Sequence, residues 1–229
     1  NATPEALQQL RDVAVKTNKK LAEKIGIKQS AAVTCVKPSG TVSQLVDAAS
    51  GIHARHNPFF IRTVRGDNKD PLTMFMRDKG IPSEPDFTAP DSVTVFSFPM
   101  KSPTNAICRN DMSAIEQLEL WLKIADNYCE HKPSVTISVK EHEWLQVGSW
   151  CWDHFNSLSG ISFLPFSDHS YQQAPYQDID EQNYRMFLKD MPPFIDWTEL
   201  QEYEKGDTTT GSQELSCSGG MCEVVDIGG

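Results

Sequence analysis

Two cysteines near the end of the chain are spaced closely enough to react with each other. Cys217 and Cys222 are joined by a short link in which Ser218, Gly219 and Gly220 are small and bendable. Two such thiols can undergo thiol–disulfide exchange, in which a thiolate attacks a disulfide through a mixed-disulfide intermediate. They could also bind zinc, but a zinc site needs two further ligands, and these are scarce nearby. The spacing therefore indicates a thiol pair and leaves its role open.

The other four cysteines lie far apart in apolar or helical surroundings, at positions 35, 108, 129 and 151. Isolated cysteines of this kind most often behave as small buried hydrophobes. The six cysteines together do not form the framework of a small disulfide-rich secreted protein. The chain also lacks a Cys-x-x-Cys pair at a helix start, which counts against a thiol redox protein that works on its own.

A segment of four residues, Pro38-Ser39-Gly40-Thr41, has the composition of an anion-binding loop. Pro38 pre-sets the turn, and Gly40 lets a ligand approach the backbone closely. Ser39 and Thr41 add hydroxyl donors. Taken alone, four such residues more often form an ordinary turn and helix cap. They are not a Walker A loop, because the wider G-x-x-x-x-G-K-[ST] pattern is absent.

The elements expected around this segment favour a phosphate ligand. We expect a short buried strand over residues 31–36 and a short helix over residues 42–46. A loop between a strand and the first turn of a helix presents unpaired N–H groups, and the helix dipole there favours negative charge.

Two histidines, His53 and His56, follow at a spacing that can belong to a metal pair. A metal site needs a third and a fourth ligand, and the next histidines, His131 and His142, are distant in the sequence. We therefore expect polar, hydrogen-bonded loop histidines and no metal site.

The rest of the chain alternates between helix and strand patterns. The first helix has an N-cap at Thr3, a proline in its first turn and a stop at Gly26. The expected helices cover residues 4–25, 42–46, 71–79, 111–129 and 144–155, and the expected strands cover residues 31–36, 59–64, 92–98, 134–139 and 160–164. This alternation predicts an α/β fold. Beyond about residue 205 the sequence is polar and turn-rich, so we expect a compact body over residues 1–204 and a flexible tail over residues 205–229.

The composition excludes several classes of protein. A net charge of −10 over 229 residues argues against a general binder of nucleic acid or of membrane surfaces, because both need a basic face. No apolar run reaches the roughly 18 residues needed to span a bilayer. No signal-peptide pattern opens the sequence, so we expect a cytoplasmic setting. The first residue is Asn1 rather than Met, and we expect a segment of a longer chain.

Several longer motifs occur in an order that resembles one enzyme family over nearly the whole chain. They cover residues 37–43, 50–56, 61–65, 131–136, 142–144, 163–165, 168–171 and 173–176. Their sequences are similar to consecutive signatures of adenosylcobalamin-dependent (class II) ribonucleotide reductases. Several motifs in one order are far more specific than any single one.

The resemblance implies a fold, a reaction and a cofactor. The fold would be the C-terminal portion of a ten-stranded α/β barrel, followed by a flexible tail. The substrate would be a ribonucleotide, with the triphosphate form of the monomeric subtype expected, and its phosphates would bind at Pro38, Ser39, Gly40 and Thr41. Adenosylcobalamin would be bound mainly by the part of the reductase that this chain lacks.

The family also needs residues that are absent here. The cysteine that becomes a thiyl radical sits in an Asn-Pro-Cys-Gly-Glu type loop, and neither Cys129-Glu130 nor Cys222-Glu223 has those surroundings. We therefore expect no activity without the N-terminal part of the reductase, supplied in cis or in trans. The resemblance assigns Cys217 and Cys222 to a tail that re-reduces the barrel and is itself reduced by a thioredoxin-like protein.

Another interpretation stays open at this point. The chain could be a phosphate-binding α/β module whose tail cysteines hold zinc, or whose tail is a stand-alone thiol redox element. If it is instead part of a barrel, the isolated chain should expose strand edges and apolar surface and be prone to aggregate.

Overall fold

The computed structural model describes residues 3–40, 42–166 and 172–205. The chain divides into two compact units, and each is built from two separate stretches of sequence. Unit 1 comprises residues 1–55 and 107–166, and unit 2 comprises residues 56–106 and 167–229. The chain therefore passes between the units at three places.

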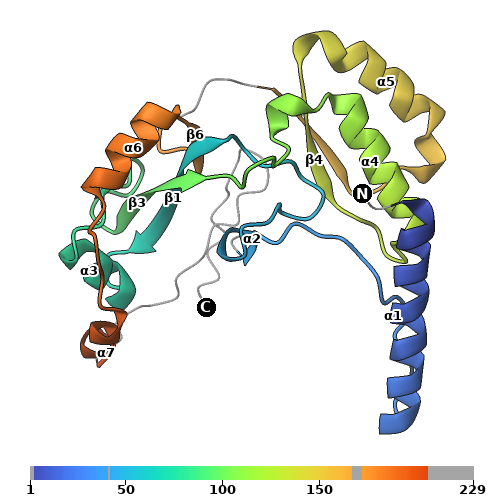
Figure 1. Cartoon of the computed structure of the whole chain (residues 1–229), viewed down its shortest axis with the longest axis horizontal. Helices are drawn as coiled ribbons and strands as arrows, with labels where there is room; N and C mark the ends of the chain where they lie inside the picture. Colours follow the sequence, from blue (N-terminus) through green and yellow to red (C-terminus); the bar gives the residue numbers. More distant parts are fainter. Residues whose placement is uncertain (1–2, 41, 167–171, 206–229) are drawn as a thin grey trace. The chain divides into compact units, whose positions relative to one another are not determined.

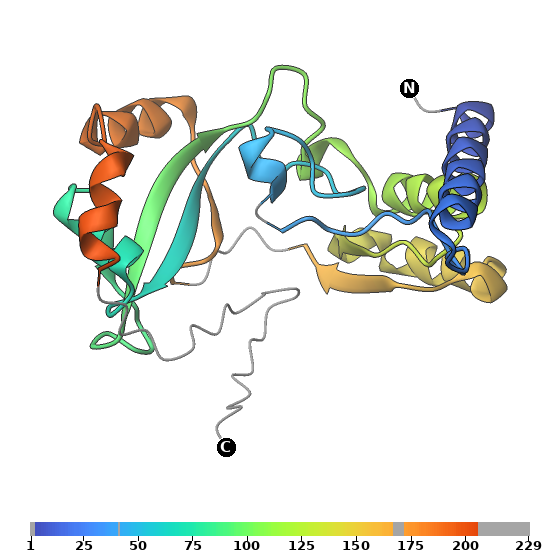
Figure 2. The same ribbon diagram turned by 90° about the horizontal axis from the view of Figure 1, so that it is seen from below.

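Unit 1 contains most of the helices and one pair of strands. Its described elements are α1 (Pro4–Ile25), α2 (Val42–Leu45), η1 (Arg109–Asp111), α4 (Ala114–Asn127), β4 (Val135–Val139), η2 (Glu141–Glu143), α5 (Trp144–Asp153), η3 (Phe155–Ser157) and β5 (Ile161–Pro165). The strands β4 and β5 pair in parallel, and α5 makes the connection between them, as Figure 2 shows. A parallel pair joined through a helix is the basic α/β unit.

Helix α1 has the ends that its sequence predicts. The Thr3 hydroxyl accepts a hydrogen bond from the N–H of Ala6 at 3.3 Å, and Pro4 occupies the first turn. Gly26 ends the helix in the left-handed conformation with φ of 73°, and its N–H reaches back to the carbonyls of Ala22 and Glu23. Both ends thus satisfy backbone groups that a helix otherwise leaves unpaired.

The core of unit 1 lies between its helices and β4. Every second residue of β4 is buried, namely Val135, Ile137 and Val139. They pack with buried residues of α4 and α5, which lie beside the strand in Figure 1: Ala114, Leu118, Trp121, Val147 and Trp150. The alternation in β4 and the helical spacing in α4 are the patterns that predicted both elements.

Unit 2 is an antiparallel sheet with helices on one side (Figures 1 and 2). Its elements are β1 (Phe59–Asp67), α3 (Pro71–Asp78), β2 (Ser83–Pro85), β3 (Val93–Lys101), β6 (Tyr176–Asp178), α6 (Glu181–Asp190), η4 (Trp197–Glu199) and α7 (Leu200–Tyr203). The strand order is β2-β3-β1-β6, and all three pairings are antiparallel.

The core of unit 2 forms between the sheet and its helices. Phe75 and Met76 of α3 pack with Ile81 and with Phe96 of β3, and all four are buried. Residues from the C-terminal helical region complete the cluster: Met191, Ile195, Leu200 and Tyr203. The sequence after residue 166 is therefore needed to cover the sheet built by residues 59–101.

The predicted strand over residues 31–36 is wrong. The segment belongs to no sheet, because the stretch beside it is irregular and contains Pro133, which has no N–H to donate. Isolated contacts replace a ladder. The Thr34 hydroxyl donates to the carbonyl of Tyr128 at 2.5 Å, the N–H of Glu130 donates to the Thr34 carbonyl at 3.0 Å, and the N–H of Ser134 donates to the Val36 carbonyl at 3.2 Å.

The other predicted elements are confirmed with shifted ends. The long helix α4 begins at Ala114 rather than near Asp111, because Ser113 forms a reciprocal capping box with Glu116. The expected elements do not include the short strand β2, the strand β6 or the helices α6 and α7. The fold is mixed α/β, with the parallel pair in unit 1 and the antiparallel sheet in unit 2.

Several large apolar side chains are exposed within each unit. On α1 they are Leu10, Val13, Leu21 and Ile25, and on α5 they include Leu145 and Trp152. None of the helices in the described ranges is both long enough and apolar enough to cross a membrane.

Candidate functional site

The candidate phosphate loop, residues 38–41, is described up to Gly40, and Thr41 lies outside the described residues. Pro38, Ser39 and Gly40 are all exposed, and Gly40 adopts the left-handed conformation with φ of 59°. The buried Ser43 donates its hydroxyl to the Gly40 carbonyl at 3.2 Å. The loop is therefore a tight turn whose outer side faces solvent.

The helix that follows the loop is shorter than a strong dipole requires. Helix α2 has only four residues, Val42–Leu45, and so amounts to a single turn. The macrodipole sums over aligned peptide units, so one turn contributes little of it. Any anion held here would depend on local N–H groups and hydroxyls rather than on a helix field.

The loop is tied to the segment that follows it through Ser50. The hydroxyl oxygen of Ser50 accepts a hydrogen bond from the N–H of Ser39 at 2.9 Å. At the next residue, Gly51, an added Cβ would lie 2.9 Å from the Lys37 carbonyl oxygen, and φ is 63°. Glycine is therefore required where the returning chain presses against the start of the loop.

His53 uses both ring nitrogens in unit 1. Its Nδ1 lies 2.8 Å from the Ser50 carbonyl oxygen, and its Nε2 accepts the N–H of Thr136 in β4 at 2.9 Å. A carbonyl can only accept and a backbone N–H can only donate, so the ring carries its proton on Nδ1. His53 thus joins the stretch from residue 38 to residue 55, which we call the loop segment, to a strand of the core.

His56 belongs to unit 2 and has a different partner. Its Nε2 lies 2.6 Å from Oδ1 of Asp178 in β6. The two histidines therefore have separate contacts, as expected for polar loop histidines. Throughout the described ranges, no group of three or more His, Cys, Asp or Glu side chains is placed to hold a metal ion.

Arg55 fixes the end of the loop segment from inside. Its side chain is 5% exposed and donates to the Ala48 carbonyl at 2.7 Å and to Oδ1 of Asp47 at 2.9 Å. Asp47 has a φ of 52°, which costs energy outside glycine. The buried guanidinium compensates for this by binding both the strained residue and its neighbour.

Two of the scattered cysteines come near each other beside this segment. Burial raises the pKa of the Cys129 thiol, and the nearby Cys35 thiol adds to the rise, whereas the N–H of Val36 and the charge of Lys37 act in the opposite direction. Burial likewise raises the pKa of Cys151. Cys108 is buried, whereas Cys35, Cys129 and Cys151 are only partly buried, so the expectation of buried cysteines is met in full by Cys108 alone.

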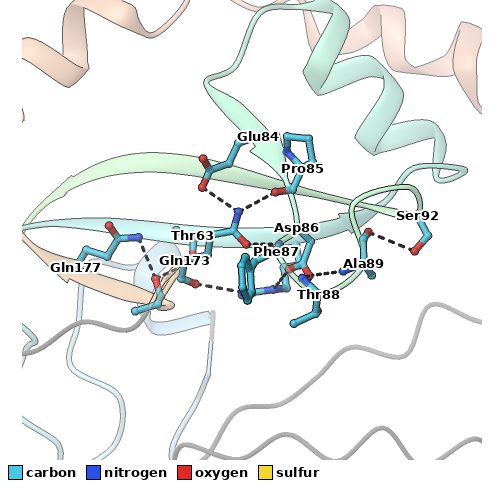
Figure 3. A network of polar contacts seen from close by, with 12 residues as sticks. Thr63, Glu84, Pro85, Asp86, Phe87, Thr88, Ala89, Ser92, Gln173 and Gln177 are labelled. Atoms are coloured by element: carbon cyan, nitrogen blue, oxygen red, sulfur yellow. Dashed lines mark hydrogen bonds and ion pairs between the residues drawn. The ribbon is translucent and has the colours of Figure 1, made fainter.

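A second set of motif residues meets in unit 2 around Asp86 (Figure 3). One oxygen of Asp86 accepts from the Thr88 hydroxyl at 2.6 Å, from the Thr88 N–H at 2.9 Å and from the Ala89 N–H at 3.0 Å. The other oxygen pairs with Nε of Arg65 at 2.7 Å. Burial alone would raise the pKa of Asp86, but these hydrogen bonds outweigh it and lower the pKa to about 2.

Gln173 completes this set, which we call the Asp86 network. Its amide nitrogen donates to Glu84 at 2.9 Å and to the Pro85 carbonyl at 2.8 Å, and its amide oxygen accepts the Phe87 N–H at 2.8 Å (Figure 3). Gln173 is 7% exposed and has a φ of 56°. The motif of residues 173–176 is thus attached to β2 and to the β2–β3 loop through Gln173, whose backbone is strained and whose side-chain amide bonds through both its nitrogen and its oxygen.

The motif of residues 61–65 contacts the same segment from β1. The Thr63 hydroxyl donates to the Ala174 carbonyl at 3.0 Å, and Arg62 lies 4.6 Å from the centre of the Tyr176 ring. Motifs that are more than a hundred residues apart in the sequence therefore meet along one strand.

A third motif residue is structural. Glu143 is buried, and its carboxylate accepts the N–H of Ala114 at 3.0 Å and the N–H of Lys140 at 2.8 Å. It therefore caps α4 from another element and holds η2 in place. From the sequence alone, this structural role of Glu143 could not be distinguished from a catalytic role.

The predicted site residues divide into two groups. Pro38, Ser39 and Gly40 lie together in one exposed turn, whereas Thr41, Cys217 and Cys222 lie outside the described residues. Sequence reasoning missed Ser50 and Asp86. Ser50 stands at the start of a recognised motif, and Asp86 stands two residues before a threonine in a proline-rich loop, which is a common turn signal.

Curated relatives match along almost the whole chain, whereas no protein-family model matches it. An adenosylcobalamin-dependent ribonucleoside-triphosphate reductase of Lactobacillus delbrueckii subsp. bulgaricus is 26% identical over 222 residues, which cover 95% of this chain and 30% of the relative. A probable adenosylcobalamin-dependent ribonucleoside-triphosphate reductase of Dictyostelium discoideum is 29% identical over 233 residues, which cover 96% of this chain and 30% of the relative.

A solved structure agrees with these relatives. The crystal structure of a B12-dependent (class II) ribonucleotide reductase matches with a TM-score of 0.72 and 26% identity, over 87% of this chain and 28% of that chain. The chain spans about 30% of the length of the curated relatives it matches. Over almost its whole length, the chain is therefore similar to part of the adenosylcobalamin-dependent, class II ribonucleotide reductases.

Proposed function

We propose that this chain is the C-terminal portion of a class II reductase that converts ribonucleotides, in the triphosphate form, to deoxyribonucleotides. The observation that carries the proposal is the match over 95% of the chain to a relative named for this reaction. The chain contributes the loop that binds the substrate phosphates and the cysteine tail that restores the reduced enzyme. The strands of unit 1 belong to the ten-stranded barrel of the complete reductase.

Substrate phosphates bind at residues 38–41. Three features support this role: the turn is exposed, Gly40 has open space around it, and Ser39 is held by Ser50. A phosphate needs several N–H and hydroxyl donors that point to one place, and a tethered turn provides them with little ordering cost on binding.

Adenosylcobalamin, which supplies radical initiation when bound, is assigned to the part of the reductase that this chain lacks. A hollow in unit 2 is lined by Glu181, Gln182, Arg185, Met186 and Lys189, all from the single helix α6. One exposed helix face cannot enclose a cobalamin, so this hollow does not fit the cofactor.

The tail acts after each turnover. Reduction of the ribose oxidises two cysteine thiols of the barrel to a disulfide. A thiolate of the Cys217–Cys222 pair attacks that disulfide, the second tail thiol releases the mixed disulfide, and the tail leaves oxidised while the barrel regains its two thiols. A thioredoxin-like dithiol then reduces the tail in the same manner.

The proposal is tested by reconstitution. The chain is combined with a folded protein that supplies the missing part, adenosylcobalamin and a dithiol, and deoxyribonucleotide formation is measured. Activity that requires both proteins is the expected result. A folded, cobalamin-binding partner that gives no product with this chain contradicts the proposal.

Two variants test the separate roles within the reconstituted enzyme. Gly40→Ala should raise KM for the triphosphate about tenfold, whereas Gly80→Ala should not, although both glycines have positive φ and open space. Cys217→Ser should abolish turnover with thioredoxin and retain it with a small dithiol that enters the barrel directly. Equal KM values for the two glycine variants would remove residues 38–41 from the substrate site.

A further inference from the structure

We propose that His53 is a positioning residue for the phosphate loop, and that it acts by linking β4 to Ser39 through Ser50. This inference rests on the proposed function in one respect only, namely that residues 38–41 receive the substrate phosphates. The link itself consists of contacts within unit 1.

The first step of the link is the ring of His53. Nε2 accepts the N–H of Thr136, a residue inside β4, at 2.9 Å. Thr136 lies between Val135 and Ile137, which are both buried in the core of unit 1. The ring is therefore held by one of the most firmly packed backbones of the unit, and strand backbone of this kind opens least.

The second step is Ser50. Its carbonyl oxygen is contacted by His53 Nδ1 at 2.8 Å and accepts the His53 N–H at 3.2 Å. Its hydroxyl oxygen accepts the Ser39 N–H at 2.9 Å and lies 3.5 Å from the Ser39 hydroxyl. Ser50 thus couples the position of the His53 ring to the position of the Ser39 backbone.

In this arrangement the Ser39 N–H holds the loop in position and does not bind the anion. It donates to Ser50 rather than outward, so the anion donors of the loop are the neighbouring N–H groups and the hydroxyls. Pro38 has no N–H and α2 is a single turn, so the described residues of the loop have few hydrogen bonds among themselves that could fix their shape. An external tether has to do so.

Two substitutions of His53 distinguish a link from a local contact. In His53→Asn the side-chain amide replaces Nδ1 and can still donate to Ser50, but it cannot reach Thr136. In His53→Gln the amide replaces Nε2 and can still accept from Thr136, but it does not reach Ser50. Each variant therefore keeps one contact, and both should fail if the two contacts act in series.

The first measurement needs only the chain itself. Nitrogen-15 spectra of the His53 ring should show the proton on Nδ1, and amide exchange at Ser39 should become about tenfold faster in both variants. His154→Asn is the control, since His154 contacts the Trp150 carbonyl in the same unit at 2.9 Å and should leave Ser39 unchanged. A proton on Nε2, or wild-type exchange in His53→Asn, overturns the link.

The second measurement uses the reconstituted reductase. Both His53 variants should raise KM for the triphosphate about tenfold and change kcat less than twofold, because they misplace a binding loop and touch no reacting atom. If Gly40→Ala raises KM and the His53 variants do not, the positioning role is wrong while the loop remains the phosphate site. If none of them raises KM, the assignment of the loop itself fails.

Discussion

The loop segment of unit 1 and the Asp86 network of unit 2 both hold irregular backbone in place with polar contacts, but they do so in opposite ways. Around Ser39, the contacts join neutral groups at or near the surface. Around Asp86, a carboxylate that is 3% exposed collects four hydrogen bonds, one of them from Arg65. Charged, buried bonds are the stronger kind.

Under the proposed function, the difference corresponds to two different tasks. A loop that binds a ligand has to keep donors available to solvent, so its own contacts stay few and weak, and its position is set by a neighbouring strand. A network that only joins strands and loops can use every donor and acceptor internally. Local stability in this chain should therefore be low at residues 38–40 and high around Asp86 and Gln173.

The largest expected effect is that of Asp86→Ala. The change leaves the N–H groups of Thr88 and Ala89 and the Arg65 side chain without their acceptor, so the free energy of unfolding should fall by about 3 kcal/mol. Urea denaturation followed by circular dichroism measures it. Asp91→Ala, in the same loop and exposed, should change stability by less than about 0.5 kcal/mol. Equal losses of stability from both substitutions would contradict the claim that the buried contacts of Asp86 stabilise the fold.

Acid should remove the contribution of Asp86 without mutation. Its folded pKa of about 2 lies below the ordinary 3.8, so the stabilisation is present above pH 3.8 and is lost as the pH falls through 2. The loss amounts to about 2 kcal/mol. Denaturation curves between pH 5 and pH 2 should show this slope in the wild type and lack it in Asp86→Asn.

Replacement of Gln173 separates side-chain contacts from backbone strain. Gln173→Ala should cost about 2 kcal/mol, because it leaves the Phe87 N–H without its acceptor. Gln173→Gly loses the same contacts but tolerates the φ of 56°, so it should be about 1 kcal/mol more stable than the alanine variant. An alanine variant that equals or exceeds the glycine variant would mean that the residue is not strained.

The smallest expected effect on global stability is that of Ser50→Ala. It removes one hydrogen bond at the surface of unit 1, so the free energy of unfolding should change by less than about 1 kcal/mol. Amide exchange at Ser39 should nevertheless become faster, because the loop opens locally. A loss as large as that of Asp86→Ala would contradict the contrast between the two regions.

The sequence predicted local elements well and long-range contacts poorly. The caps of α1, the alternation in β4 and the helical spacing in α4 are local signals, and each element appears close to its expected place. The expected strand at residues 31–36 does not form, because the stretch that lies beside it in the fold contains Pro133. The two stretches are far apart in the sequence, so no local pattern indicates that they meet. The turn at residues 38–40 was predictable from its residue types, whereas Ser50 and Gln173 act on partners that only the fold brings near.

Unit 2 is built from two separate stretches of sequence, so during synthesis it cannot complete its fold until the second stretch has emerged. Arg62 in β1 donates to the Pro175 carbonyl, a partner 113 residues later in the chain. At roughly 5–20 residues per second, a ribosome needs on the order of ten seconds to deliver that partner. During this interval β1 pairs with β3 but exposes its other edge, so the nascent chain should be a substrate for chaperones that shield open strands until β6 emerges.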